Sequence, residues 1–198
     1  MNKTMLKLGL VLALFAGTAC ASLAVVYSLT AETIAAHQQE ELNAALKQIF
    51  PATDGFDIIT GKLSSADPKI SIGGAYAVKK SGALIGIAVQ AKGPSYGGEA
   101  ALLSGFSADK KVVRVVVLDL KDTPGLGANA ANHAYYVDKA NKTTFPGQFS
   151  GKSLSDPFQV KDDVAAITAS TITSQALTAI VKASGDAAAG YLATGGAK

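Results

Sequence analysis

The chain has 198 residues and carries 18 Lys+Arg against 15 Asp+Glu, a formal net charge of +3. This length allows one compact domain with an appendage. Two of the positive residues, Lys3 and Lys7, precede an apolar N-terminal run. The rest of the chain is therefore almost neutral, and nothing in it indicates a nucleic-acid-binding surface. The single cysteine, Cys20, excludes an internal disulfide and a thiolate cluster for zinc or iron–sulfur. His37 and His133 stand far apart, so we expect no metal site.

Residues 8–31 form an uncharged, mostly apolar run. As a helix rising about 1.5 Å per residue, the run would extend roughly 36 Å, enough to cross the hydrocarbon core of a bilayer. A cleaved signal peptide is the alternative, but the run is longer than a signal core and stays apolar after Cys20. A lipoprotein is disfavoured because Gly17 stands where a large aliphatic residue would precede the cysteine. We therefore predict a retained single-pass membrane anchor over residues 1–31, with a cytoplasmic N-terminus and an extracytoplasmic domain.

A stalk helix is predicted over residues 32–52. Apolar residues recur at helical spacing through this segment: Ile34, Leu42, Leu46 and Ile49. Either Thr30 or Thr33 caps a new helix here, or the anchor helix simply continues, and Pro51 ends the pattern.

Residues 53–198 consist of short apolar runs separated by glycine, proline and aspartate, a pattern typical of strands and turns. The predicted strands are 56–59, 75–78, 84–90, 100–106 and 112–120. A helix is predicted over 128–140, a short strand over 158–160, and a last helix whose apolar residues run from Leu177 to Tyr191. This order indicates an α+β domain with a mainly antiparallel sheet and flanking helices.

The segment Asp122-Thr123-Pro124-Gly125-Leu126-Gly127 follows the most strongly β-branched run. Pro124 and Gly125 fit the two central positions of a type II turn, where glycine supplies a positive φ. Gly127 would leave room for a flat ring to approach the backbone. Taken alone, the segment is more simply a tight loop leaving a sheet. The loop Tyr96-Gly97-Gly98 either lines the same cleft or only joins two strands.

The segment Thr168-Ala169-Ser170-Thr171-Ile172-Thr173-Ser174 places a cluster of hydroxyl groups at the start of the last predicted helix. A helix start offers unpaired backbone N–H groups and a positive dipole end, so it suits a phosphate. Hydroxyl-rich helix starts are also common as simple caps. Gly151 and Lys152 lack the preceding glycine at the spacing of a Walker A motif, so they do not form a P-loop. Lys152 is more simply a solvated charge than a phosphate ligand.

Together these segments resemble the FMN-binding domain of membrane redox pumps. The family's flavin-attachment motif, Ser-Gly-Ala-Thr-x-Thr, is matched by residues 168–173, and its companion Glu-Thr-Pro-Gly-Leu-Gly by residues 122–127. The resemblance covers most of the chain and is closest to the G subunit of the Rnf complex, an ion-translocating ferredoxin:NAD oxidoreductase. The related C subunit of sodium-translocating NADH:quinone reductase is the alternative, but it is typically longer.

The resemblance implies a redox subunit in which FMN is bound covalently as a phosphate ester of Thr171. Its partners would be the other membrane subunits of the complex and a flavin transferase, with electron transfer coupled to Na⁺ or H⁺ transport. The residues assigned to the cofactor are Thr171 for the ester, and Thr168, Ser170, Thr173, Asp122, Thr123, Gly125, Leu126, Gly127, Tyr96 and Lys152 around it. The sequence departs from the family pattern in having Asp122 for glutamate, Ala169 for glycine and Ser170 for alanine.

Two other classes of protein remain open at this stage. A pilin-like adhesive protein also joins an apolar helix to a β domain, but this chain lacks the cleavage-site glycine and the early glutamate. A membrane-anchored, non-redox domain that binds flavin or another phosphate ester reversibly is the third class.

Overall fold

The computed structural model describes residues 3–59, 61 and 63–193. The described chain divides into two compact units, residues 3–41 and residues 42–193, and each is described by itself. The sheet, the remaining short elements and the last helix all belong to the second unit.

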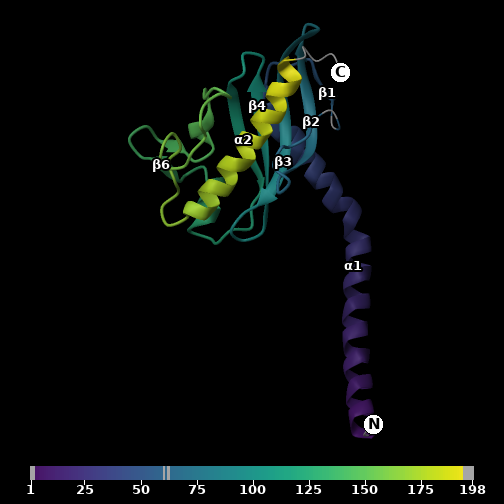
Figure 1. The fold of residues 1–198 in the computed structure, drawn as a ribbon. Helices are drawn as coiled ribbons and strands as arrows, with labels where there is room; N and C mark the ends of the chain where they lie inside the picture. The colour runs from purple at the N-terminus through teal and green to yellow at the C-terminus, as the bar shows by residue number, and fades with distance from the viewer. Residues whose placement is uncertain (1–2, 60, 62, 194–198) are drawn as a thin grey trace. The chain divides into compact units, whose positions relative to one another are not determined.

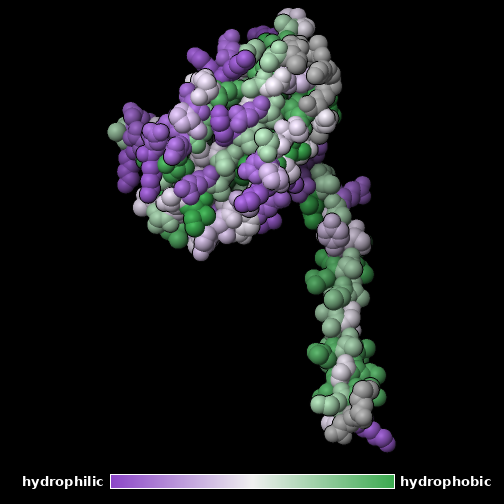
Figure 2. Space-filling model, viewed as in Figure 1, coloured by the Kyte–Doolittle hydropathy of each residue, from purple (hydrophilic) through white to green (hydrophobic). Residues whose placement is uncertain are grey.

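Helix α1 (Lys3–Ile49) runs without a break through the predicted anchor and stalk. Thr30 does not begin a new helix, because its Oγ1 donates a hydrogen bond back to the Val26 carbonyl at 2.9 Å, as a residue inside a helix does. The simpler expectation, a continuous helix, is therefore confirmed, and the helix ends just before Pro51. Its most apolar window has a mean hydropathy of 2.2 and none of it is buried, so by length and composition the helix could cross a membrane. Figure 2 shows this apolar surface in green along the helix.

The second unit is built on a five-stranded antiparallel sheet whose strands follow one another in chain order. The strands are β1 (Gly55–Ile58), β2 (Ser71–Lys80), β3 (Ala83–Pro94), β4 (Glu99–Ser107) and β5 (Val112–Asp119). All five were predicted, and β2 and β3 extend well beyond the predicted ends. Between β2 and β3 a two-residue turn places Ser81 and Gly82 at positive φ, which matches the right-handed twist of the hairpin.

Both faces of the sheet are covered within this unit. Helix α2 (Thr171–Ala193) packs Leu177, Ile180 and Val181 against one face, and Figure 1 shows it lying across the strands. The last two turns of α1 cover the opposite face, where Leu46 and Ile49 join the cluster of Val78, Ala88 and Leu103. Because both faces are buried, the central strand β4 is almost continuously buried and shows no regular alternation with polar residues.

Two predicted elements are wrong. Residues 128–140 do not form an α-helix: a 3-10 helix η1 (Gly127–Ala131) ends at Asn132, and β6 (Tyr136–Asp138) follows, paired with β7 (Thr143–Thr144). The reason is Asn132, whose extended backbone leaves the helix and whose Oδ1 accepts a hydrogen bond from Ala134 N–H at 2.9 Å. A second 3-10 helix, η2 (Gly147–Phe149), comes after β7.

Residues 158–160 do not form the predicted strand. Phe158 has a φ of 52°, outside the strand region, and the Asp163 carboxylate accepts hydrogen bonds from the N–H groups of Phe158 and Gln159. The segment is therefore a loop folded around a partly buried carboxylate.

Candidate functional site

A cavity of about 590 Å³ lies where three loops of the second unit meet. One side comes from the loop between β3 and β4, another from the loop after β5, and the third from the turn and first residues of α2. Its lining residues are Tyr96, Thr123, Leu126, Gly127, Ala169, Ser170, Thr171, Ile172 and Thr173. The three segments singled out in the sequence thus surround one space.

Asp122 holds these three segments together. Its Oδ2 accepts hydrogen bonds from Thr173 Oγ1 and, at 2.8 Å, from Ser95 Oγ, while its Oδ1 accepts one from Gly97 N–H at 2.7 Å. The side chain is buried, and it is not among the lining residues of the cavity. Its carboxylate therefore positions the loops that form the cavity.

The same hydrogen bonds set the protonation state of Asp122. Burial alone would raise the pKa of Asp122, but the hydrogen bonds from Thr173, Gly97 and Ser95 outweigh it and hold the pKa below its ordinary value of 3.8. The side chain is thus a carboxylate at neutral pH.

Two glycines shape the loop after β5. Gly125 has a φ of 77°, and Leu126 N–H donates to the Thr123 carbonyl at 3.1 Å, so the predicted type II turn is confirmed. Gly127 lines the cavity, and contacts within the chain also require a glycine there. A Cβ there would lie 2.5 Å from Thr173 Oγ1 and 2.7 Å from Asp122 Oδ2, so a larger residue would break that contact.

The start of α2 is fixed by Ser174. Its Oγ accepts a hydrogen bond from Ile167 N–H at 2.9 Å and donates one to the Ser170 carbonyl at 2.9 Å. Ser170 N–H also donates to the Ile167 carbonyl at 3.0 Å, which closes a turn with Ala169 at a φ of 59°. The turn leads directly into α2, whose first backbone N–H groups have no carbonyl acceptor within the helix.

Among the four predicted hydroxyls, Thr171 is the one that lines the cavity, is not buried and makes no hydrogen bond in the described part of the chain. Thr173 is 2% exposed and bonded to Asp122, and Ser170 is 7% exposed. Thr168 is exposed but does not line the cavity, and its N–H donates to Tyr135 Oη at 3.3 Å.

Lys152 lies outside this site. Its Nζ pairs with Asp163 Oδ2 at 3.1 Å, and both side chains are about four-fifths buried. Burial would raise the pKa of Asp163, but the hydrogen bond from Gln159 N–H and the Lys152 ammonium outweigh it and lower the pKa. Lys152 therefore stabilises the loop around residue 163, and it does not line the cavity.

Three contributors to the site were not predicted. Ile172 and Ala169 line the cavity, and Ser95 binds Asp122. Ile172 could have been recognised as a large apolar residue inside a hydroxyl cluster, whereas nothing in the sequence distinguishes Ser95 from an ordinary loop serine.

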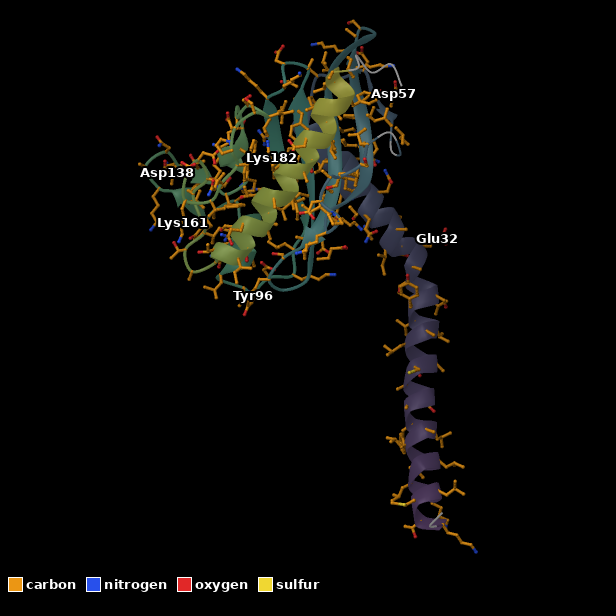
Figure 3. The ribbon with its side chains drawn as sticks, in the orientation of Figure 1. Glu32, Asp57, Tyr96, Asp138, Lys161 and Lys182 are labelled. Atoms are coloured by element: carbon orange, nitrogen blue, oxygen red, sulfur yellow. The ribbon has the colours of Figure 1, made fainter. Side chains whose placement is uncertain are left out.

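Large exposed apolar side chains gather at the cavity. Tyr96 is 66% exposed, Ile172 60% and Leu126 42%, and Ile58 is the other large exposed apolar residue among the described part of residues 42–193. Figure 3 shows Tyr96 at the margin of the domain, near the end at which α2 begins. Such a concentration marks a binding surface.

Comparison with known protein families agrees with this geometry. Residues 1–49 match a family model described as the RnfG N-terminal region, and residues 95–185, which include the whole cavity lining, match one described as an FMN-binding domain.

Three curated relatives align over most of their own length. The chain is 29% identical to the G subunit of the Na⁺-translocating ferredoxin:NAD⁺ oxidoreductase complex of Acetobacterium woodii, over 92% of the chain and 90% of the relative. It is 32% identical to the G subunit of the proton-translocating ferredoxin:NAD⁺ oxidoreductase complex of Clostridium ljungdahlii, over 81% and 78%. It is 31% identical to the G subunit of the ion-translocating oxidoreductase complex of Shewanella oneidensis, over 92% and 88%.

Proposed function

Because the chain belongs to the family of G subunits of Rnf-type ion-translocating oxidoreductase complexes, we propose that it is the electron-transfer subunit of such a complex and carries FMN as a phosphate ester of Thr171. Bound FMN supplies the redox chemistry, since it exchanges electrons singly or in pairs, and the protein supplies position and electrostatics.

The start of α2 suits the phosphate. The first-turn N–H groups and the positive end of the helix dipole favour a negative group there, with no need for a nearby arginine or lysine. Thr171 lies in this first turn with a free hydroxyl facing the cavity, while Ser170 is almost completely buried beside it. Ester formation would join Thr171 Oγ1 to the flavin phosphorus of a flavin dinucleotide donor and break its phosphoanhydride bond, and the nucleoside monophosphate would leave with the hydroxyl proton. The chain would gain the mass of FMN less one water.

The other end of the cavity suits a flat apolar ring. A cavity of about 590 Å³ is within the usual range for small-molecule sites. Tyr96, Leu126 and Ile172 offer exposed apolar surface at its margin. A ring packed on these side chains would keep an edge open to solvent or to a neighbouring subunit, which short-range electron transfer requires.

The N-terminal helix supports membrane attachment. Its apolar part is long enough to span a bilayer, and Lys3 and Lys7 precede it. Positive residues are retained on the cytoplasmic side, so the flavin would lie on the extracytoplasmic side. Outside the cell a covalent bond prevents loss of the cofactor, and a flavin transferase would form it.

The observation that carries this proposal is the Thr171 hydroxyl, which lies in the first turn of α2, lines the cavity and makes no hydrogen bond in the described part of the chain. The test is the intact mass of the full-length chain produced together with its flavin transferase, followed by peptide mapping. We expect the added mass on the peptide that contains Thr171, and flavin fluorescence that stays with the chain after denaturation.

Variants sharpen the test. Thr171→Val should give a folded protein without flavin, whereas Ser170→Ala and Thr168→Val should remain yellow. Full flavin occupancy in Thr171→Val would refute the assignment, and flavin released on denaturation of the wild type would indicate reversible binding.

A further inference from the structure

The two edges of the sheet differ in how they are protected. At one edge, β1 has only four residues and carries Asp57, paired with Lys79 at 2.6 Å. At the other edge, β5 has eight residues, five of them valine. Proteins protect sheet edges by keeping them short, charged or covered, and a long β-branched edge pairs readily with another chain.

Among the described residues, only those at the beginning of β5 form hydrogen bonds on its outer edge. Val112 exchanges backbone hydrogen bonds with Lys152 and Gly151, each at 2.8 Å, and Ser150 Oγ donates to the Val113 carbonyl at 2.9 Å. From Arg114 to Asp119, in the described part of the chain, the backbone pairs with β4 alone. In Figure 1 the β6 region lies beyond this edge of the sheet.

A groove follows the uncovered part of β5. It is a cavity of about 300 Å³ lined by four consecutive strand residues, 114–117, and the segments around η1 and η2 form its walls. Four consecutive residues of an edge strand can line one cavity only if the cavity runs beside their backbone. The groove is therefore shaped for an extended segment, and a compact ligand would fit it less well.

The groove also carries one positive charge, that of Arg114. Arg114 and His133 both line it, and both are exposed. Neither forms an ion pair or a hydrogen bond through its side chain in the described part of the chain. Among the described residues, no acidic side chain lines the groove. Charge complementarity thus calls for a carboxylate.

We propose that β5 is a docking edge, on which an extended, carboxylate-bearing segment of another subunit of the same membrane complex adds as a sixth strand, its acidic group meeting Arg114. Backbone hydrogen bonds supply affinity in this mode of recognition, and side-chain pockets supply specificity. The inference rests on the proposed membership of a multi-subunit complex, but it concerns a surface separate from the cavity that contains Thr171.

Hydrogen exchange on the assembled complex and on the isolated full-length chain tests the strand. We expect amides within residues 114–119 to exchange at least tenfold more slowly in the complex, and those of β1 to be unchanged. Equal exchange of residues 114–119 in the two samples would overturn the proposal. Because Thr171→Val would remove the flavin and leave this protection intact, a failure here is distinct from a failure of the flavin assignment.

Crosslinking identifies the occupant. A photoreactive amino acid in place of Ala131, which lines the groove, should crosslink to an extended acidic stretch of a neighbouring subunit. A crosslink to a second copy of this chain, to a helix, or to lipid alone would overturn the proposal.

Charge reversal tests the carboxylate. Arg114→Glu should lower the amount of chain recovered with the complex at least tenfold, and Arg114→Lys should largely restore it. Lys80→Glu, an exposed site at the far end of β2, is the matched control and should assemble normally. Unchanged flavin content and melting temperature would show that Arg114→Glu still folds, and normal assembly of that variant would refute the role of Arg114.

Discussion

Asp122 and Thr173 stand 51 residues apart in the chain, yet the carboxylate of one accepts a hydrogen bond from the hydroxyl of the other. The contact joins the loop after β5 to the first turn of α2, and Ser95 and Gly97 extend it to the loop after β3. The two sequence motifs are thus parts of one hydrogen-bonded structure, whose surface is the cavity.

Replacing Asp122 with asparagine should destabilise the domain by about 1.5–3 kcal/mol, because hydrogen bonds to a charged, buried acceptor are the stronger ones. Chemical denaturation of the wild type and the variant measures this. Asp119→Asn is the control, since Asp119 is exposed and its pairing with Lys121 contributes little. A loss as small as that of the control would show that Asp122 does not hold the loops.

The pKa of Asp122 also predicts an acid limit to stability. The folded-state pKa is lowered, so the carboxylate stabilises the fold at pH values above the unfolded-state pKa of about 4. That stability is lost as the pH falls through the folded-state pKa, because the unfolded chain then binds more protons. Denaturation midpoints between pH 3 and 7 should therefore fall at the acid end, less steeply in Asp122→Asn. A parallel decline in both proteins would assign the loss to other carboxylates such as Asp163, whose pKa is also lowered.

Ala169 occupies a left-handed backbone conformation in the turn before α2. A side chain there costs roughly 1–2 kcal/mol, and glycine avoids that cost. Since glycine also raises the entropy of the unfolded chain, Ala169→Gly should stabilise the domain by about 0.5–1 kcal/mol net. The matched control is Ala179→Gly on the exposed side of α2, which should destabilise by about 1 kcal/mol. Thermal unfolding distinguishes the two, and a loss of stability in both would contradict the backbone argument.

Two buried serines should respond in opposite ways to alanine. Ser104 on β4 is completely buried and its Oγ has no hydrogen-bond partner in the described part of the chain, so Ser104→Ala should leave stability unchanged or raise it by up to about 1 kcal/mol. Ser174→Ala would leave the Ile167 N–H without its acceptor and should cost about 1–3 kcal/mol. Urea denaturation of both variants measures the contrast. A comparable loss in Ser104→Ala would mean that its hydroxyl has a partner, such as a bound water.

The sequence was most informative where local chemistry decides the structure. The β-branched and apolar runs located all five strands of the sheet, and Pro124 with Gly125 located the type II turn. The cluster of hydroxyls located the start of α2, because a helix start needs such groups to satisfy its backbone.

Tertiary structure decided the rest. The helical pattern over 128–140 failed because the Asn132 side chain binds the backbone two residues on and ends the helix. Lys152 was assigned to the cofactor only through the resemblance, and its side chain pairs with Asp163, eleven residues later. The resemblance assigned Asp122 to the cofactor, and only the folded chain shows that its oxygens accept hydrogen bonds from Ser95, Gly97 and Thr173.

The last turns of α1 have a consequence for how the protein can be divided. Leu46 and Ile49 at the end of α1, and Phe50 just after it, are buried against the sheet. This segment is therefore an integral layer of the domain, although α1 also contains the predicted anchor. A protease that cut near residue 41 would release a water-soluble piece with both sides of its sheet shielded. A cut after Phe50 would remove this layer and expose Val78, Ala88 and Leu103 on one face of the sheet. Their exposed apolar surface would promote aggregation.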